Sequence, residues 1–140
     1  MFDVSYDVQL DYLRDEDTGD AYPGLWLEIG ARQTTDSAIH IRCNLDSGAS
    51  RSIVRGEVAL ALGLDLLSGP AQVYGTLAGT RLEARLHRVH LSHPELGTCE
   101  LEVGFATVPV ARNLLGRDFF DLFQIGFREH HSTLYFVREL

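Results

Sequence analysis

Short runs in which apolar and polar side chains alternate are the feature that most limits how this chain can fold. The alternation is found in four segments, 25–29, 39–45, 82–86 and 101–105. A period of two is typical of β-strands that bury one face and leave the other in water. Residues 57–62 and 119–123 favour helices, and both stretches are short. The pattern predicts a mainly β chain, folded as a closed barrel or sandwich with one or two short helices.

Further strands and one irregularity follow from the same pattern. Additional strands are predicted at 4–13, 108–110, 114–115, 125–127 and 134–136. From Val89 onward the apolar positions change from even to odd numbers, which predicts a β-bulge near His87 or Arg88. Gly63 suits the left-handed position that follows the first helix.

Composition excludes several classes of function. The 140 residues are 45% apolar and 23% charged, so we expect a single domain, 1–140, with an acidic N-terminal strand and loop at 1–24. All 12 basic residues are arginine, which excludes a P-loop, a Schiff-base lysine and a Ser–Lys dyad. The formal charge of −8 argues against nucleic-acid and membrane partners. The N-terminus resembles no signal peptide and no run could span a bilayer, so we expect a cytoplasmic protein.

Cysteine and histidine patterns favour ordinary structural roles. Cys43 and Cys99 are far apart in the sequence and are expected to be reduced thiols. His87, His90 and His93 form an array that invites a metal interpretation. Intervals of three place neighbouring histidines on opposite faces of a strand, so we expect neither a metal nor another cofactor. A zinc site that includes Cys99 is the weaker alternative.

One loop contains the residues that point to a chemical function. Asp46 ends the predicted strand 39–45 and is followed by Ser47, Gly48, Ala49 and Ser50. A carboxylate in such a turn is well placed to meet a second carboxylate, and two carboxylates in contact share one proton. The charged member then takes a proton from water while the protonated member polarises a carbonyl, which hydrolyses an amide. The alternative is a turn aspartate that only bonds to nearby backbone.

Residues 45–50, Leu-Asp-Ser-Gly-Ala-Ser, resemble the active-site motif of the retropepsin-like aspartic proteases, the retroviral type of clan AA. Three more features follow in that family's order. A strand at 53–54 and a helical element at 58–63 come first. The family's flap hairpin is matched by Tyr74, Gly75, Thr76, Leu77, Ala78 and Gly79. Its second signature is matched by Leu114, Leu115, Gly116, Arg117 and Asp118. The resemblance implies an aspartic endopeptidase with Asp46 as the catalytic residue and a flap that covers the peptide.

The number of motifs bears on the number of subunits. Asp17-Thr18-Gly19 also matches the bare tripeptide, but it follows polar residues and is expected to be an exposed turn. With one catalytic loop per chain, the resemblance implies a homodimer in which Asp46 meets its own copy at the two-fold axis. The expected partners are therefore a second copy of this chain and a peptide or protein substrate. A dimerisation or peptide-binding module without turnover is the alternative function.

One segment after the motif departs from the family pattern. Retroviral members often carry an acid shortly after the motif, which pairs with the arginine of the second signature. This chain has Ser50-Arg51-Ser52 there, which leaves Arg117 without that partner. Asp118 is expected to be the N-cap of the second helix.

Overall fold

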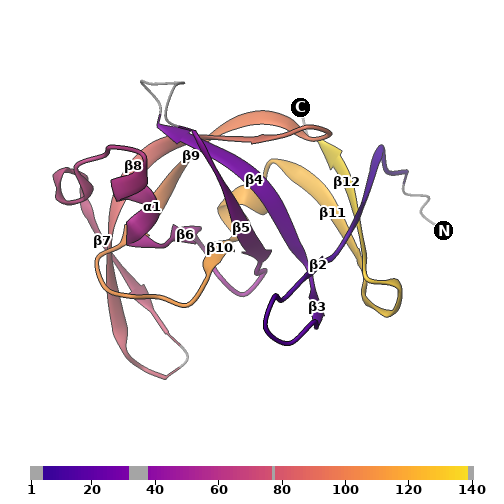
Figure 1. Ribbon diagram of the computed structural model, residues 1–140, viewed down its shortest axis with the longest axis horizontal. Helices are drawn as coiled ribbons and strands as arrows, with labels where there is room; N and C mark the ends of the chain where they lie inside the picture. The colour runs from indigo at the N-terminus through magenta and orange to yellow at the C-terminus, as the bar shows by residue number, and fades with distance from the viewer. Residues whose placement is uncertain (1–4, 32–37, 77, 139–140) are drawn as a thin grey trace.

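A closed barrel of six strands forms the centre of the protein. The computed structural model describes residues 5–31, 38–76 and 78–138. Around the barrel the strands follow in the order β4 (Gly24–Ala31), β5 (Ile39–Leu45), β10 (Asn113–Leu115), β6 (Ile53–Val54), β9 (Gly97–Ala106) and β8 (Arg81–His93). β8 then pairs with β4 and closes the barrel. The predicted mainly β fold is confirmed (Figure 1).

Short elements attach to this barrel. β7 (Ala71–Gly75) pairs with the first part of β8 and forms a hairpin that extends beyond the barrel. The helices are α1 (Gly56–Ala61) and α2 (Arg117–Phe120), with 3₁₀ turns η1 (Leu66–Ser68) and η2 (Glu129–His131). In the described residues, none of these helices is long and apolar enough to cross a membrane.

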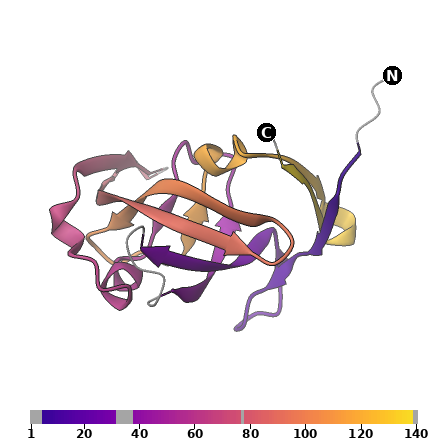
Figure 2. The same ribbon diagram turned by 90° about the horizontal axis from the view of Figure 1, so that it is seen from above.

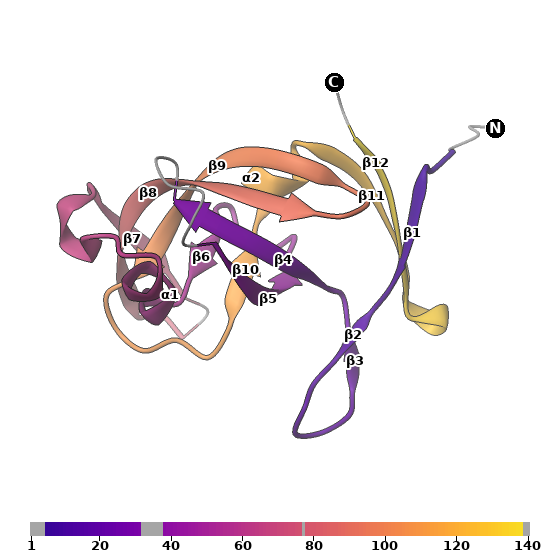
Figure 3. The same ribbon diagram turned by 45° about the horizontal axis from the view of Figure 1, so that its top comes forward.

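The two ends of the chain build a second sheet. β1 (Val8–Asp11) pairs with β12 (Thr133–Arg138), which pairs with β11 (Phe123–Arg128). A small hairpin of β2 (Leu13–Arg14) and β3 (Ala21–Tyr22) connects β1 to β4. Figures 2 and 3 show this sheet at one side of the barrel, with the β2–β3 hairpin projecting from the same side.

The predicted bulge in β8 is wrong, because β8 contributes its two faces to two different cores. Its pairing with β9 runs without a break from Ala84↔Ala106 to His93↔Gly97. The odd-numbered Val89 and Leu91 enter the main core. The even-numbered Ala84 belongs to a smaller cluster beside the flap hairpin. The change of the apolar positions from even to odd numbers therefore marks the point at which β8 stops packing against the smaller cluster and begins to pack against the main core.

Other local predictions also need correction. Residues 108–110 form no strand, and Val108 is 49% exposed; Pro109 lacks the N–H that a ladder needs. The N-terminal strand predicted at 4–13 is interrupted at Tyr12, a buried side chain that bonds to Glu129. The second helix lies at Arg117–Phe120 instead of 119–123, so Phe123 begins β11.

Candidate active site

The end of β5 holds Asp46 at the edge of the barrel. β5 lies between β4 and β10, and its pairing with β10 is parallel. The Asp46 N–H continues this ladder with a 2.9 Å hydrogen bond to the carbonyl of Leu115. Leu45 is buried, whereas Asp46 is half-buried. The strand therefore anchors the backbone of Asp46 while its carboxylate reaches the surface.

Two hydrogen bonds from backbone N–H groups hold the turn that follows Asp46. The Ala49 N–H donates to the Asp46 carbonyl at 3.1 Å, and the Gly48 N–H donates to Asp46 Oδ1 at 2.9 Å. The second bond is the local bond expected of a turn aspartate. It uses one carboxylate oxygen, and no hydrogen bond reaches Oδ2 from any described residue. Ser47, Gly48 and Ser50 are exposed and Ala49 is half-buried, so the loop presents an oriented carboxylate to its surroundings.

The second signature lies directly behind this loop. β10 ends at Leu115, and the Arg117 N–H donates to the Ala49 carbonyl at 2.8 Å. A Cβ at Gly116 would lie 2.6 Å from that carbonyl oxygen. Only glycine therefore lets the two segments approach so closely. Leu114, the middle residue of β10, pairs with Ile53 of β6.

Ser52 was not singled out in the sequence, yet it organises this region. Its side chain is fully buried. Its N–H and hydroxyl donate to the Asp118 carboxylate at 3.0 and 2.7 Å, and its hydroxyl oxygen accepts the Gly116 N–H at 3.0 Å. Its position soon after the catalytic motif was its only signal. A serine there carries no pattern of its own.

Asp118 and Arg117 differ from their expected roles. Asp118 lies inside α2, whose N-cap position is Gly116, so the predicted N-cap is wrong. The Asp118 carboxylate instead joins the second signature to Ser52. The Arg117 side chain is exposed and forms no ion pair with any described residue.

The segment predicted to be the flap forms a hairpin between β7 and β8. The Thr76 N–H donates to the Thr80 carbonyl at 3.0 Å, and the Gly79 N–H donates to the Thr76 carbonyl at 3.0 Å. Gly79 adopts a φ of +77°, which glycine tolerates best. Gly75 and Ala78 are exposed, and Leu77 lies outside the described residues. In Figure 1 the tip of this hairpin and the loop after β5 lie on the same, lower side of the molecule.

Tyr74 points inward from the flap. Its hydroxyl donates to the Ser52 carbonyl at 3.1 Å. It also packs closely over Gly104 of β9, where a Cβ would lie 2.5 Å from the tyrosine oxygen. Desolvation by this burial is the main cause that raises the pKa of Tyr74. Tyr74 thus connects the β7–β8 hairpin to Ser52.

The Asp-Thr-Gly tripeptide at residues 17–19 is an exposed turn, as predicted. Asp17, Thr18 and Gly19 connect β2 to β3, and all three are exposed. The Asp17 and Thr18 N–H groups donate to the Asp15 carboxylate. These bonds, with Thr18 the stronger influence, hold the pKa of Asp15 below its usual value. The turn is therefore held by the carboxylate of Asp15.

The three histidines of the array each interact with a different part of the protein. His87 Nε2 lies 2.9 Å from the Leu66 carbonyl, His90 lies 3.7 Å from Glu100, and His93 Nδ1 accepts the Glu95 N–H. Within 5–31, 38–76 and 78–138, no three metal-binding side chains gather into a site. Cys43 and Cys99 are both free thiols.

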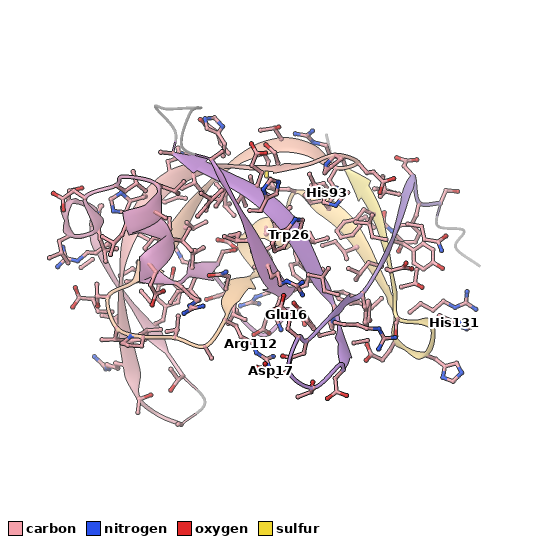
Figure 4. All side chains as sticks on the ribbon, viewed as in Figure 1. Glu16, Asp17, Trp26, His93, Arg112 and His131 are labelled. Atoms are coloured by element: carbon pink, nitrogen blue, oxygen red, sulfur yellow. The ribbon has the colours of Figure 1, made fainter. Side chains whose placement is uncertain are left out.

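A cleft of about 650 Å³ lies beside β5. Its walls come from the outer face of β5, the β2–β3 turn, α1 and the residues before β10. Figure 4 shows Glu16 and Asp17 on that turn close to Arg112, with Trp26 of β4 near them. No local sequence pattern indicates this cleft, because its walls come from five separate segments.

Comparisons with known proteins agree with this geometry. Residues 34–119 match the family described as aspartyl protease. The fold is similar to that of a retropepsin-like aspartic protease from Rickettsia conorii, with a TM-score of 0.58 and 22% identity over 92% of this chain and 98% of the other. It is also similar to EIAV protease complexed with the inhibitor HBY-793, with a TM-score of 0.54 and 19% identity over 74% and 89%. Among curated proteins, none matches.

Proposed function

Because the chain belongs to the aspartyl protease family, we propose that it is an aspartic endopeptidase that works as a homodimer. The observation that carries the proposal is the Asp46 carboxylate, which one Gly48 N–H orients at an open edge of the barrel. No described residue brings a second carboxylate into hydrogen-bond contact with it. A second copy of the chain supplies the missing group, since a two-fold axis beside the loop brings Asp46 against its own copy.

The reaction follows from the properties of two carboxylates in contact. They share one proton, because both cannot ionise at a short separation. The ionised Asp46 removes a proton from water, and the protonated Asp46 of the other subunit donates a hydrogen bond to the peptide carbonyl. The water oxygen then attacks the carbonyl carbon. The carboxyl that took the proton from water passes a proton to the leaving nitrogen as the C–N bond breaks, which releases a carboxylic acid and an amine. The Ser47 hydroxyls, one from each chain, bond across the axis and hold the two loops together.

The flap hairpin covers the substrate in this proposal. An extended peptide lies as an added strand beneath residues 75–79, whose backbone groups at the tip bond to it. The inward position of Tyr74 supports this role, because its bond to the Ser52 carbonyl ties the base of the flap to the catalytic region. The tip then moves while the base stays fixed.

Cleavage of a mixed peptide library from about pH 4 to pH 8 tests the proposal. Asp46→Asn is the decisive variant, and Asp20→Asn, at an exposed acid of the turn between β2 and β3, is its matched control. We expect cuts by the wild-type protein and by Asp20→Asn, and none by a folded, dimeric Asp46→Asn. Sedimentation of each variant establishes its dimeric state. Normal cutting by Asp46→Asn would disprove the mechanism, whereas peptide binding without cutting by the wild type would favour a peptide-binding module.

A further inference from the structure

The cleft beside β5 shares a strand face with the catalytic carboxylate. Alternate residues of a strand point the same way, so Asn44 and Arg42 lie on the face of Asp46, opposite the buried Cys43 and Leu45. The ladder bond from Asp46 to Leu115 continues this geometry to the catalytic residue. Asn44 lines the cleft, and residues two apart on a strand are separated by about 7 Å. The cleft therefore begins one pleat from Asp46.

The wall of the cleft already binds one guanidinium group. Arg42 lies over the ring of Trp26, 5.4 Å from its centroid. Its Nη2 pairs with Glu16 at 3.1 Å, and its Nη1 donates to the Arg14 carbonyl at 2.9 Å. An aromatic face with carboxylate and carbonyl oxygens is the environment in which guanidinium groups are bound. The Trp26 ring also stacks with His40, with 5.7 Å between the ring centroids, yet Trp26 is 48% exposed, so part of the residue remains open to solvent.

The remaining charges of the cleft are predominantly negative. Glu16 pairs with Arg42, and Glu57 pairs with Arg55. After these two ion pairs are set aside, the charged groups that remain in the cleft are the carboxylates of Asp15 and Asp17 and one guanidinium group, that of Arg112.

Asp17 forms no side-chain hydrogen bond or ion pair in the described part of the chain, and it lies beside Arg112 in Figure 4. Arg112 interacts electrostatically with Asp15. The free acceptor at the mouth of the cleft is therefore Asp17. The formal charge of −8 on the whole chain also attracts basic peptides.

We propose that this cleft is a substrate subsite that selects an arginine or lysine side chain, an inference that rests on the proposed peptidase function. The aliphatic stem of the substrate residue lies against the open part of Trp26. Its cationic head binds the Asp17 carboxylate, and Asn44 offers an amide oxygen near the catalytic end. Arg112 opposes the cation and limits its affinity.

Trp26 is the only tryptophan of the chain, so its fluorescence reports on the cleft directly and without turnover. The experiment titrates dimeric Asp46→Asn with acetylated hexapeptides that carry Arg, Gln or Glu at each position in turn. We expect a saturable change of Trp26 emission that occurs at the lowest concentration with an Arg peptide. Adding Asp17→Asn should weaken that binding by about fivefold, and adding Arg112→Gln should strengthen it.

Asp20→Asn is the matched control, since Asp20 is an exposed acid at the end of the same turn but lies outside the cleft. It should leave binding of the Arg peptide unchanged. Tightest binding of the Glu peptides, equal binding of all three types, or no change of Trp26 emission with any peptide would overturn the inference. Equal effects of Asp17→Asn and Asp20→Asn would overturn it as well.

The two proposals fail in distinguishable ways. If the wild-type protein cuts the peptide library but shows no preference for Arg or Lys, the subsite is wrong and the peptidase stands. If Arg peptides bind at Trp26 in the expected order but nothing is cut, the cleft binds a basic side chain and the peptidase is wrong.

Discussion

The hydroxyl of Ser52 donates a 2.7 Å hydrogen bond to the carboxylate of Asp118, across 66 positions of the chain. The same hydroxyl oxygen accepts the Gly116 N–H. The segment after the catalytic loop and the start of α2 are thus joined through one buried side chain. Since Arg117 forms no ion pair with the described residues, Asp118 makes the polar connection between these segments.

Removing the Ser52 hydroxyl should destabilise the fold. Ser52→Ala deletes a donor to a carboxylate and leaves the Gly116 N–H without its acceptor. We expect the free energy of unfolding to fall by about 2 kcal/mol, measured by urea denaturation. Ser68→Ala is the control, because the Ser68 hydroxyl bonds to the Asp65 carbonyl at an exposed site; its change should stay below about 0.5 kcal/mol. Equal losses in the two variants would contradict the role of Ser52.

Gly116 should tolerate no larger side chain. A Cβ there would lie 2.6 Å from the Ala49 carbonyl oxygen and 2.9 Å from that of Arg51. Backbone atoms cannot move aside as a flexible side chain can, so Gly116→Ala must push the segment from Ala49 to Arg51 away. We expect a loss of about 2 kcal/mol or more in the free energy of unfolding, measured by thermal and urea denaturation.

Gly75→Ala is the matched control for this substitution. A Cβ at Gly75 meets nothing within 4 Å, so its stability should change by less than about 0.5 kcal/mol. If Gly116→Ala proves as stable as Gly75→Ala, the close approach of the two segments is not needed for folding.

Tyr12 should make stability depend on alkaline pH. Burial and the nearby Glu129 carboxylate raise the pKa of Tyr12 from 10.0 to about 12. The folded state therefore holds this proton more tightly than the unfolded state. Its stabilising contribution is complete below about pH 10 and is lost as the pH rises toward about 12.

Urea midpoints measured across that range should fall less steeply in Tyr12→Phe than in the wild-type protein. Phenylalanine has no proton to lose, so the part of the slope that belongs to Tyr12 disappears. Parallel slopes in the two proteins would show that Tyr12 titrates normally.

The two cysteines should differ in reactivity. Burial raises the pKa of the Cys43 thiol to about 12, and it also raises the pKa of the half-buried Cys99 thiol. The thiolate is the reactive form, so iodoacetamide at neutral pH should modify Cys99 slowly and Cys43 only after unfolding. Peptide mass mapping of native and urea-unfolded protein distinguishes the sites. Faster modification of Cys43 than of Cys99 in the native protein would contradict its burial.

The alternation of apolar and polar residues predicted a strand well where that strand packs against a single core. β5 was predicted at its observed bounds, because every second side chain from Ile39 to Leu45 enters the same interior. The pattern failed in β8, where Ala84 and Val89 enter different cores from opposite faces. Alternation shows that a side chain is buried, but it does not show what the side chain is buried against.

The amino-acid sequence by itself determined the strand-rich architecture, the position of Asp46 after a buried strand, and the order of loop, flap and second signature. Each of these depends on neighbours within a few residues. Only the tertiary structure decided the partner of Ser52, the inward direction of Tyr74 and the cleft on the Asp46 face of β5. These features join side chains from distant segments. Their geometry follows from how the barrel closes, because strand order and register bring those segments together in space.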